Sequence, residues 1–590
     1  MIRLPASLTP LQGGRTLART QALKRTWPVI MDVCIAAIGL ACFYGVVRVA
    51  HYWMGQSQPE VVISLQPRAL PLYAFYSLVR IFVAYAISLV FAISYGYIAA
   101  HNRRLEPLLV AGLDICQSIP VLSFLPGVML AMVALFPTRQ LGVEMGAILL
   151  IFTGEVWNMA FSFYSSIKSI PSDLNEAATI YRFSRWQRLW QLELPYAAIG
   201  LVWNSIVSVS GGWFFLMACE MFVLGPRDFR LPGLGSYLQT AASTSNTSAI
   251  LTGLATMIAL IVAIDQLVWR PAIAWSERFK FEQVESVGRV HSPFLYVLSN
   301  SRPLRVIRER AISPISERIY THLARNHERQ QSHSIEATEL RLQLTIRWIV
   351  VALCIALTVY LAGQAVGLLR QVNLVELKAV FKGAGATFLR VNCALLIAAL
   401  WTVPAGVAIG FNPRLSRIAQ PLAQIAASVP ATALFPIMLL GLIRVGGGMG
   451  LASILLMLIG TQWYILFNVI AGAMAIPSDL REVATLFHFT AIQRWRTVIL
   501  PGIFPFLITG LVTASGGAWN ASIIAEYFHL NNQTMQTIGL GAEISSATDQ
   551  GQFQLLLLAT IVMALMVVTI NRLVWRPLYR LAETRFKLEG

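Results

Sequence analysis

The chain has 590 residues, of which 56% are hydrophobic and only 12% are charged. Soluble proteins carry roughly 25% charged residues, so this composition excludes an ordinary soluble domain. Many apolar runs instead reach the length of about 20 residues that a helix needs to cross a bilayer. The sequence therefore predicts an all-α, polytopic membrane protein.

The first half of the chain is expected to contain a short cytoplasmic segment, residues 1–27, and then a domain over residues 28–278. Lys24 and Arg25 precede the first apolar run without a small-residue cleavage site, so we predict a retained span and not a cleaved signal peptide. The six spans predicted in this domain lie near residues 28–50, 71–100, 108–136, 139–166, 196–224 and 248–271.

A polar connector rich in arginine follows over residues 279–343. Its interleaved charges predict amphipathic helices on the cytoplasmic face, either as a simple covalent tether or as a regulatory or partner-docking segment. A second domain is expected over residues 344–590. Its six predicted spans lie near residues 345–368, 380–410, 418–443, 447–472, 502–528 and 551–575.

The two domains repeat each other at a nearly constant offset. Equivalent residues include Pro171 and Pro477, Trp213 and Trp519, Glu220 and Glu526, and, upstream of a shorter loop, Arg80 and Arg390. This correspondence indicates an internal duplication fused head to tail. Because each copy has an even number of spans, both keep the same orientation, and the repeat is parallel.

The formal net charge of +17 has two explanations. A basic surface would bind nucleic acid through its phosphates, whereas a membrane protein collects Lys and Arg in its cytoplasmic loops. Placing both termini in the cytoplasm puts most of the 45 Lys and Arg residues on that side. We therefore predict a multi-pass protein of a lipid bilayer, with cytoplasmic termini and no nucleic-acid partner.

One polar octet occurs in both halves, as "IPSDLNEA" over residues 170–177 and "IPSDLREV" over residues 476–483. Each copy opens the cytoplasmic segment between the fourth and fifth spans. Asp173 and Asp479 precede Glu176 and Glu482 by three residues, which is the spacing of a capping box. A Leu-Pro pair later in each segment suits the first turn of the next span. Each half therefore predicts a short, capped amphipathic helix lying along the membrane.

The longer segments read "EAATIYRFSRWQRLWQLELP" over residues 176–195 and "EVATLFHFTAIQRWRTVILP" over residues 482–501. Both resemble the EAA loop of permeases in binding-protein-dependent ABC importers of the type I fold. The third spans, with "SIPVLSFLP" and "SVPATALFP", and the Trp and Glu of the fifth spans are similar to the nitrate, sulfonate and taurine branch. The resemblance implies two permease domains fused in one chain, in a bacterial inner membrane.

The resemblance further implies that both loops dock onto two cytoplasmic ATPase subunits, expected to be a homodimer, with a periplasmic substrate-binding protein as a possible further partner. Arg182 and His488 stand where the family has a glycine that permits a sharp turn, so the motif leaves the turn angle open. These two replacements, together with Val483 in place of the motif's first alanine, favour an ATPase that is dedicated to this chain. The residues implied in ATPase coupling are Asp173, Glu176, Ala177, Ala178, Arg182, Pro195, Asp479, Glu482, Ala484, His488 and Pro501.

No enzymatic motif is found in the chain. The Walker A pattern is absent from the sequence, so there is no phosphate-binding loop with its lysine. G-x-S-x-G, H-E-x-x-H and C-x-x-C are absent as well. We therefore expect a transport subunit with no catalytic residue, no metal site and no cofactor of its own, whose partner ATPases bind the ATP and Mg²⁺.

Ionisable residues inside spans are functional candidates because a buried charge is costly in hydrocarbon. Glu155 lies deep in the fourth span, and its equivalent is Thr461, so any site that it forms is asymmetric. Glu220 and Glu526 are expected either to flank the outer mouth of the pathway or to reach periplasmic water. The aromatic candidates for the pathway are Trp157, Trp213, Trp463 and Trp519.

Three further residues are interpreted structurally. Arg80 and Arg390 are expected to anchor the outer ends of the second spans, and Asp265 to make an interhelical hydrogen bond. Acidic groups near the predicted pathway outnumber basic ones, which favours a zwitterionic, cationic or neutral polar solute over a bare anion. Two other functions are compatible with twelve spans, an ion-coupled secondary transporter of the major facilitator type and a non-transporting scaffold, but neither explains the repeated octet.

Overall fold

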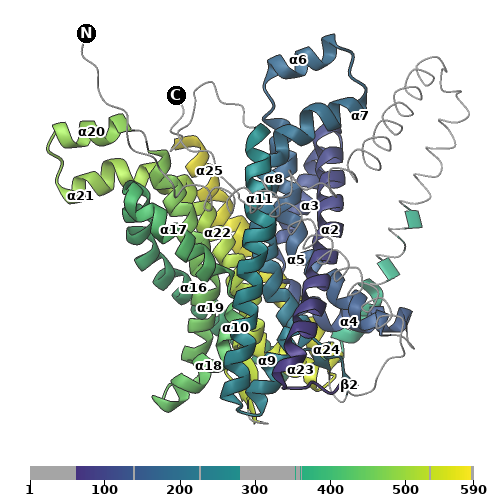
Figure 1. Cartoon of the computed structure of the whole chain (residues 1–590). Helices are drawn as coiled ribbons and strands as arrows, with labels where there is room; N and C mark the ends of the chain where they lie inside the picture. Colours follow the sequence, from purple (N-terminus) through teal and green to yellow (C-terminus); the bar gives the residue numbers. More distant parts are fainter. Residues whose placement is uncertain are drawn as a thin grey trace, which may run out of the picture.

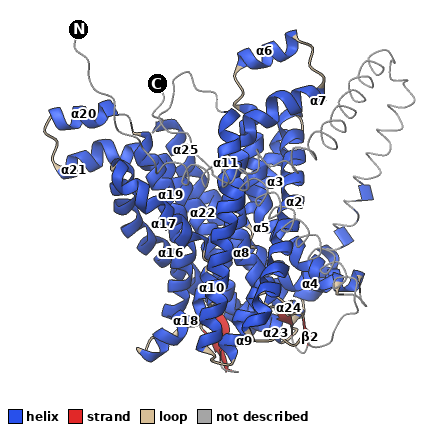
Figure 2. Ribbon diagram, in the orientation of Figure 1, coloured by secondary structure: helices blue, strands red, loops and turns tan. Residues whose placement is uncertain are grey.

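The computed structural model describes residues 61–136, 140–224, 227–279, 362–476, 478–530 and 533–585, with five residues between 352 and 360. Within this part of the chain, eight helices are long and apolar enough to cross a membrane. The predicted segments 1–27 and 28–50, residues 280–343 of the connector and half of the span predicted over 345–368 lie outside the described residues. The described part confirms an all-α, polytopic architecture (Figure 2).

The first repeat contains the second to sixth predicted spans. Its elements are η1 (Pro67–Ala69), α2 (Leu70–His101), α3 (Glu106–Ser118), η2 (Val121–Phe124), α4 (Leu125–Leu135), α5 (Leu141–Lys168), α6 (Ser172–Ile180), α7 (Arg185–Arg188), the π-helix η3 (Leu189–Glu193), α8 (Leu194–Glu220), β1 (Val223–Leu224), β2 (Arg227–Asp228), α9 (Leu234–Ser243), α10 (Thr247–Ile264), the π-helix η4 (Asp265–Trp269), α11 (Arg270–Ser276) and η5 (Glu277–Phe279).

The second repeat follows the same order. Its elements are α16 (Leu374–Phe411), α17 (Pro413–Ser428), α18 (Ala431–Arg444), α19 (Met449–Ala475), α20 (Ser478–Leu486), α21 (Ala491–Arg494), the π-helix η7 (Trp495–Ile499), α22 (Leu500–Ala525), β3 (Tyr527–Leu530), β4 (Gln533–Gln536), α23 (Leu540–Asp549), α24 (Phe553–Ile570), the π-helix η8 (Asn571–Trp575) and α25 (Arg576–Arg585). The π-helical turns occupy equivalent positions in both copies.

Each third span is broken into two helices, which corrects the prediction of a single helix over residues 108–136 and 418–443. The breaks fall at Pro120 and Pro430, and the preceding Ile119 and Val429 are extended, with ψ of 129° and 117°. Proline has no N–H to continue the helix, and its ring disfavours the helical conformation of the residue before it. The two prolines therefore explain both breaks.

Two sets of three packed helices form the body of the molecule. In the first repeat α5 lies between α2 and α8, and in the second α19 lies between α16 and α22. Small residues allow this close packing, as in membrane helix pairs generally. Gly96 of α2, for example, faces α5, and a Cβ there would lie 3.0 Å from the ring of Phe163.

The two ends of the molecule differ. At one end, α6 with α7 and α20 with α21 project as two separate arms (Figure 1). At the opposite end lie α9, α23 and the short strands, which form antiparallel hairpins β1–β2 and β3–β4 (Figures 1 and 2). We refer to these as the arm end and the hairpin end. The hairpins and the helices α9 and α23 were not predicted; they lie in residues 224–248 and 528–551, between the predicted fifth and sixth spans.

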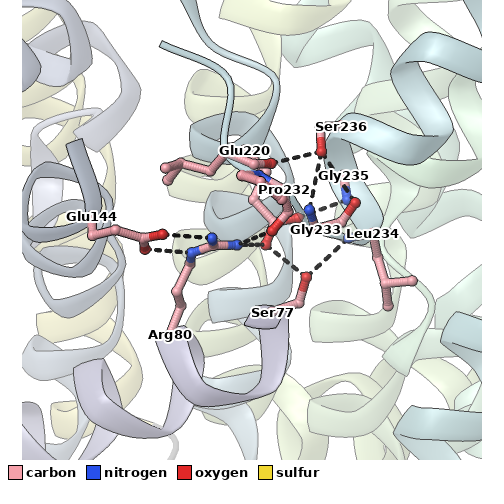
Figure 3. A network of polar contacts seen from close by, with 10 residues as sticks. Ser77, Arg80, Glu144, Glu220, Pro232, Gly233, Leu234, Gly235 and Ser236 are labelled. Carbon is pink, nitrogen blue, oxygen red and sulfur yellow. Dashed lines mark hydrogen bonds and ion pairs between the residues drawn. The ribbon is translucent and has the colours of Figure 1, made fainter. Parts of the chain in front are cut away.

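A buried ion-pair network holds the hairpin end of the first repeat together (Figure 3). Arg80 of α2 donates two parallel hydrogen bonds to the carboxylate of Glu144 on α5, at 2.6 and 2.7 Å. Its remaining nitrogen Nη1 donates to Glu220 Oε1 at 2.7 Å and to the carbonyl of Pro232 at 2.9 Å. This network, which we call the first clamp, ties α2, α5, α8 and the chain entering α9.

Glu220 is satisfied on every side. The hydroxyl of Ser77 donates to Oε1 at 2.6 Å, and the backbone N–H of Gly235 donates to Oε2 at 2.7 Å. Gly235 lies in the first turn of α9, where free N–H groups favour a negative charge. A Cβ on Gly233 would collide with the Glu220 carboxylate. This explains the first glycine of the sequence "GLG", which occurs at residues 233–235 and again at residues 539–541.

The second clamp has the same design with one carboxylate fewer, because Arg390 Nη2 donates to the hydroxyl of Thr537 at 2.9 Å in place of a second acid. Arg390 Nη1 donates to Glu526 Oε1 at 2.8 Å, and Thr387 replaces Ser77 as the hydroxyl donor. The position equivalent to Glu144 is Gly450, so Arg390 has one carboxylate partner and its side chain is 15% exposed. The expectation that Glu220 and Glu526 reach water is wrong, because both are fully buried. Arg80 and Arg390 are ion-pair partners and not surface anchors.

The two clamps predict unequal costs of mutation. Replacing Arg80 by Met leaves two buried carboxylates without a counter-charge, which is expected to cost about 3–5 kcal/mol. Arg390→Met leaves one such carboxylate and is expected to cost less. Thermal unfolding of the purified chain in detergent measures both. Equal losses of melting temperature would contradict the structural difference between the clamps.

Candidate functional site

The two arms are built by the segments that carry the repeated octet. The first arm, residues 170–195, runs from the end of α5 through α6, a tight turn, α7 and η3 into α8. The second arm, residues 476–501, runs from α19 through α20 and α21 into α22 in the same way. Pro195 and Pro501 lie in the first turn of α8 and α22, as the sequence predicts. Both arms project from the same end (Figure 1).

The turn in each arm is left-handed, although the residue there is not glycine. Arg182 has φ of 48° and His488 has φ of 50°. In the first arm the N–H of Arg182 donates to the carbonyl of Thr179 and that of Phe183 to the carbonyl of Ala178, both at 3.0 Å. This is the Schellman pattern that ends a helix, in which glycine is the usual left-handed residue. The same two bonds recur in the second arm, so the turn is kept without its glycine.

The capping-box prediction for the first octet is wrong. Pro171 is the N-cap of α6, no side chain caps the helix, and Asp173 lies exposed in its first turn. The side chain of Asp479 is outside the described residues. Capping boxes instead begin the next helices, from Ser184 and Gln187 in α7 and from Thr490 and Gln493 in α21. The patterns "SRWQ" and "TAIQ" have the Ser/Thr-x-x-Gln spacing of a capping box, but the prediction placed the box in the octet.

The arms are attached to the body by different chemistry. In the first arm, Arg188 donates to Asn175 Oδ1 at 2.6 Å and to Glu193 Oε1 at 3.2 Å. The same Glu193 oxygen lies 2.9 Å from Nε2 of His101, at the end of α2. These contacts connect α6, α7, the start of α8 and α2.

The second arm has a smaller polar attachment. Asn175, His101 and Glu193 are replaced in the second repeat by Arg481, Phe411 and Ile499. Arg481 lies over the ring of Phe411 with its guanidinium carbon 5.3 Å from the ring centre, a cation–π contact between α20 and the end of α16.

Each arm exposes an adjacent pair of large apolar residues at the end of its first helix. Ile180 and Tyr181 are 78% and 75% exposed, and Leu486 and Phe487 are 75% and 72% exposed. The coupling acids Glu176 and Glu482 are exposed, Ala177 is half-buried, and Ala178 and Ala484 are buried beneath the arms. Trp186 and Trp190 add a stacked, exposed pair to the first arm, with ring centres 6.5 Å apart. The arms therefore present acidic and apolar side chains to their surroundings.

The predicted pathway residues do not gather at one place. Trp213 and Trp519 are almost fully buried, while Trp157 and Trp463 are half-buried in separate apolar clusters of the two repeats. Glu155 is fully buried in α5. A pocket between the repeats lies against α8 and is lined by Ile206, Val209, Ser210, Trp213, Ile261, Ile264, Asp265, Trp269 and Gln424.

Asp265 links the two repeats across this pocket. Its Oδ1 accepts a hydrogen bond of 3.4 Å from Gln424 of α17, and its Oδ2 accepts from Arg270 at 3.2 Å. This confirms the predicted interhelical hydrogen bond.

A family model described as the binding-protein-dependent transport system inner membrane component matches residues 67–268 and again residues 402–585. The chain belongs to this family. The double match confirms a permease of the type I ABC importer class in which the permease domain occurs twice. It leaves no basis for the major facilitator or scaffold alternatives, and it makes this permease a multi-pass protein of the inner membrane.

Individual relatives agree with the predicted branch. The permease is 29% identical to the nitrate import permease protein NrtB of Leptolyngbya laminosa over 32% of this chain and 64% of the relative. It is 28% identical to the bicarbonate transport system permease protein CmpB of Synechococcus elongatus over 33% and 68%. It is 29% identical to the taurine transport system permease protein TauC of Escherichia coli over 28% and 55%. The match thus spans about two thirds of the first two relatives and about half of the third.

The left-handed turns predict how the arms respond to mutation. Arg182→Gly removes the strain of a side chain at positive φ and is expected to stabilise the turn by about 1 kcal/mol. Arg182→Val places a β-branched residue there and is expected to loosen α6. Hydrogen exchange of the α6 amides measures both, with slower exchange for Gly and faster exchange for Val. His488 offers the matched pair of variants, and no change in either arm would contradict the assignment.

Proposed function

We propose that the permease forms the solute pathway of an ATP-driven ABC importer and that its two arms are the docking sites of two ATPase subunits. The observation that carries this proposal is the pair of equivalent arms at one end of the molecule, each exposing an acid and two large apolar residues. Exposed apolar side chains of this size are unfavourable in water and are typical of a protein interface. Two equivalent arms suit a dimeric partner, and a homodimer is the simplest one.

The attachments of the arms support a mechanical role. When the ATPases close on ATP, they would draw the two arms together, and the ion pairs of Arg188, Glu193 and His101 would carry that movement into α2 and α8. The repeats would then rock against each other about their shared axis, as parallel repeats in transporters do. The arm end is accordingly the proposed cytoplasmic end, with both chain termini on that side.

The nucleotide belongs to the partner in this proposal. Without a Walker A loop, the permease has no means of holding the phosphates, so the ATP and Mg²⁺ would be bound by the ATPase subunits. The hairpin end would face the periplasm, where a substrate-binding protein would deliver the solute. The residues proposed to line or support the pathway are Glu155, Trp157, Trp213, Trp463 and Trp519, whereas Glu220 and Glu526 hold the fold together.

The relatives carry the names of nitrate, bicarbonate and taurine transporters. We propose a small polar solute for this permease. A zwitterionic or cationic solute, rather than a bare anion, agrees best with a Glu155 carboxylate that has no counter-charge among the described residues.

Charge reversal in the arms tests the docking role. The double variant Glu176→Arg and Glu482→Arg is expected to abolish co-purification with the ATPase and to stop ATP-driven uptake, because both docking surfaces change sign. Lys378→Glu, an exposed charge near the hairpin end, is the control and is expected to leave both intact. Undiminished uptake by the double variant would refute the coupling role.

The apolar pairs provide a second, independent test. Replacing Ile180 and Tyr181 by serine is expected to weaken ATPase binding at least 30-fold, since interface hot spots contribute about 2 kcal/mol or more each. The equivalent change at Leu486 and Phe487 is expected to have a similar effect. Binding of the purified ATPase to the permease in nanodiscs measures this. Because these residues are exposed, unchanged melting temperatures would separate lost docking from lost folding.

A further inference from the structure

A buried polar cluster in the first repeat has no counterpart in the second. Glu155 lies near the middle of α5 and is fully buried, and neither of its carboxylate oxygens has a hydrogen-bond partner among the described residues. Across the helix contact, Ser208 of α8 is 2% exposed, and its hydroxyl is also unpartnered within the described part of the chain. Two facing helices thus bring three unsatisfied oxygen atoms into the interior.

The packing shows that these groups share one location. Gly212 of α8 lies directly against Glu155, since a Cβ there would collide with the carboxylate. Ser208 precedes Gly212 by four residues and therefore lies on the same face of α8. One turn earlier, the hydroxyl of Ser205 contacts the sulfur of Met159 at 3.4 Å, and Met159 follows Glu155 by four residues on α5. The polar groups accordingly lie along the α5–α8 contact.

A third helix closes the cluster. Tyr85 of α2 donates its hydroxyl hydrogen to Ser205 at 3.1 Å, which places the phenol beside the α5–α8 contact. The ring of Tyr85 packs edge-on against Trp269, with ring centres 5.8 Å apart, and Trp269 lines the pocket between the repeats. Tyr85 thus contacts both Ser205 of the cluster and Trp269 of that pocket.

The second repeat has lost every part of this arrangement. The equivalent residues of the second repeat are Thr461 for Glu155, Ala514 for Ser208, Leu511 for Ser205, Leu395 for Tyr85 and Ala518 for Gly212. Thr461 is satisfied locally by the carbonyl of Met457. The equivalent helices of the second repeat, α19 and α22, therefore pack together without a charged side chain at this position. The carboxyl, the hydroxyls and the space left by Gly212 are specific to the first repeat.

We propose that Glu155, with Ser208 and Tyr85, forms a binding site for a singly charged cationic group. The cation is either an inorganic monovalent ion or the protonated amine of a transported solute. A carboxylate and hydroxyl oxygens are the donors that such a group prefers, and no basic side chain bonds to Glu155 among the described residues. The cationic group supplies the counter-charge that Arg80 supplies to Glu220 at the hairpin end. The amine source rests on the proposed transport function, whereas binding of an inorganic ion does not.

The purified full-length permease in nanodiscs allows a direct test without any ATPase. Melting temperature is measured against increasing NaCl, KCl or methylammonium chloride, with N-methyl-D-glucamine chloride keeping the ionic strength constant. A ligand that binds only the folded state raises the melting temperature with concentration. A rise with Na⁺ or K⁺ identifies an inorganic ion, and a rise with methylammonium alone identifies an amine.

Three variants locate the response. Glu155→Gln keeps the side-chain shape and is expected to weaken the apparent affinity at least 10-fold, and Ser208→Ala to weaken it several-fold. Thr461→Val, at the equivalent position of the second repeat, is the matched control and is expected to respond like the wild type. The proposal is overturned if Glu155→Gln retains the full response, or if no probe stabilises the wild type beyond N-methyl-D-glucamine. Because the assay contains no ATPase, either result leaves the docking proposal standing.

Discussion

A membrane interior offers no water to a buried polar group, and this constraint organises the whole permease. At the hairpin end it is met by the clamps, in which Glu220 and Glu526 receive an arginine, a hydroxyl and the N–H of a helix start. Each clamp ties the second and fifth spans of its repeat to the short helix that follows the hairpin. The fold at that end therefore depends on two fully buried carboxylates, Glu220 and Glu526.

The two repeats share this plan but have diverged in their polar groups. The first has the additional acids Glu144 and Glu155, and its arm is attached by ion pairs through Glu193. The second has Gly450, Thr461 and Ile499 at these positions. Both repeats keep the same order of main helices, the π-helical turns and the left-handed turn of the arm. The chemistry that distinguishes one half from the other is concentrated in the first repeat, so a single fused chain can offer a solute an asymmetric path.

The sequence allowed the second, fourth, fifth and sixth spans of each repeat, the duplication and the arms to be predicted, because hydrophobic length and an in-register repeat can be read from the sequence alone. It also identified Glu155 as too deep to reach a surface. The ion pair of Glu220 could not be found in this way, because Arg80 lies 140 residues away from it in the sequence. The second acid of the first clamp, Glu144, lies 64 residues from Arg80. The capping boxes at Ser184 and Thr490 have a recognisable sequence pattern but were not predicted, because the capping box was assigned to Asp173 in the octet instead. The conformation of Arg182 could not be read either, because the family pattern uses glycine for that turn.

The contacts at the two ends of the first repeat explain how an arm could act at a distance. Helix α2 carries Arg80 toward the hairpin end and His101 at the arm end, while Glu193 and Glu220 bracket α8. The pairs Arg80–Glu220 and His101–Glu193 therefore join the same two helices at both ends. In the second repeat Arg390–Glu526 fastens α16 and α22 near the hairpins, whereas Phe411 contacts Arg481 of the arm. In the proposed mechanism, a pull on the first arm would act on a helix pair that is joined at both ends, and the Glu155 cluster lies between these two joints.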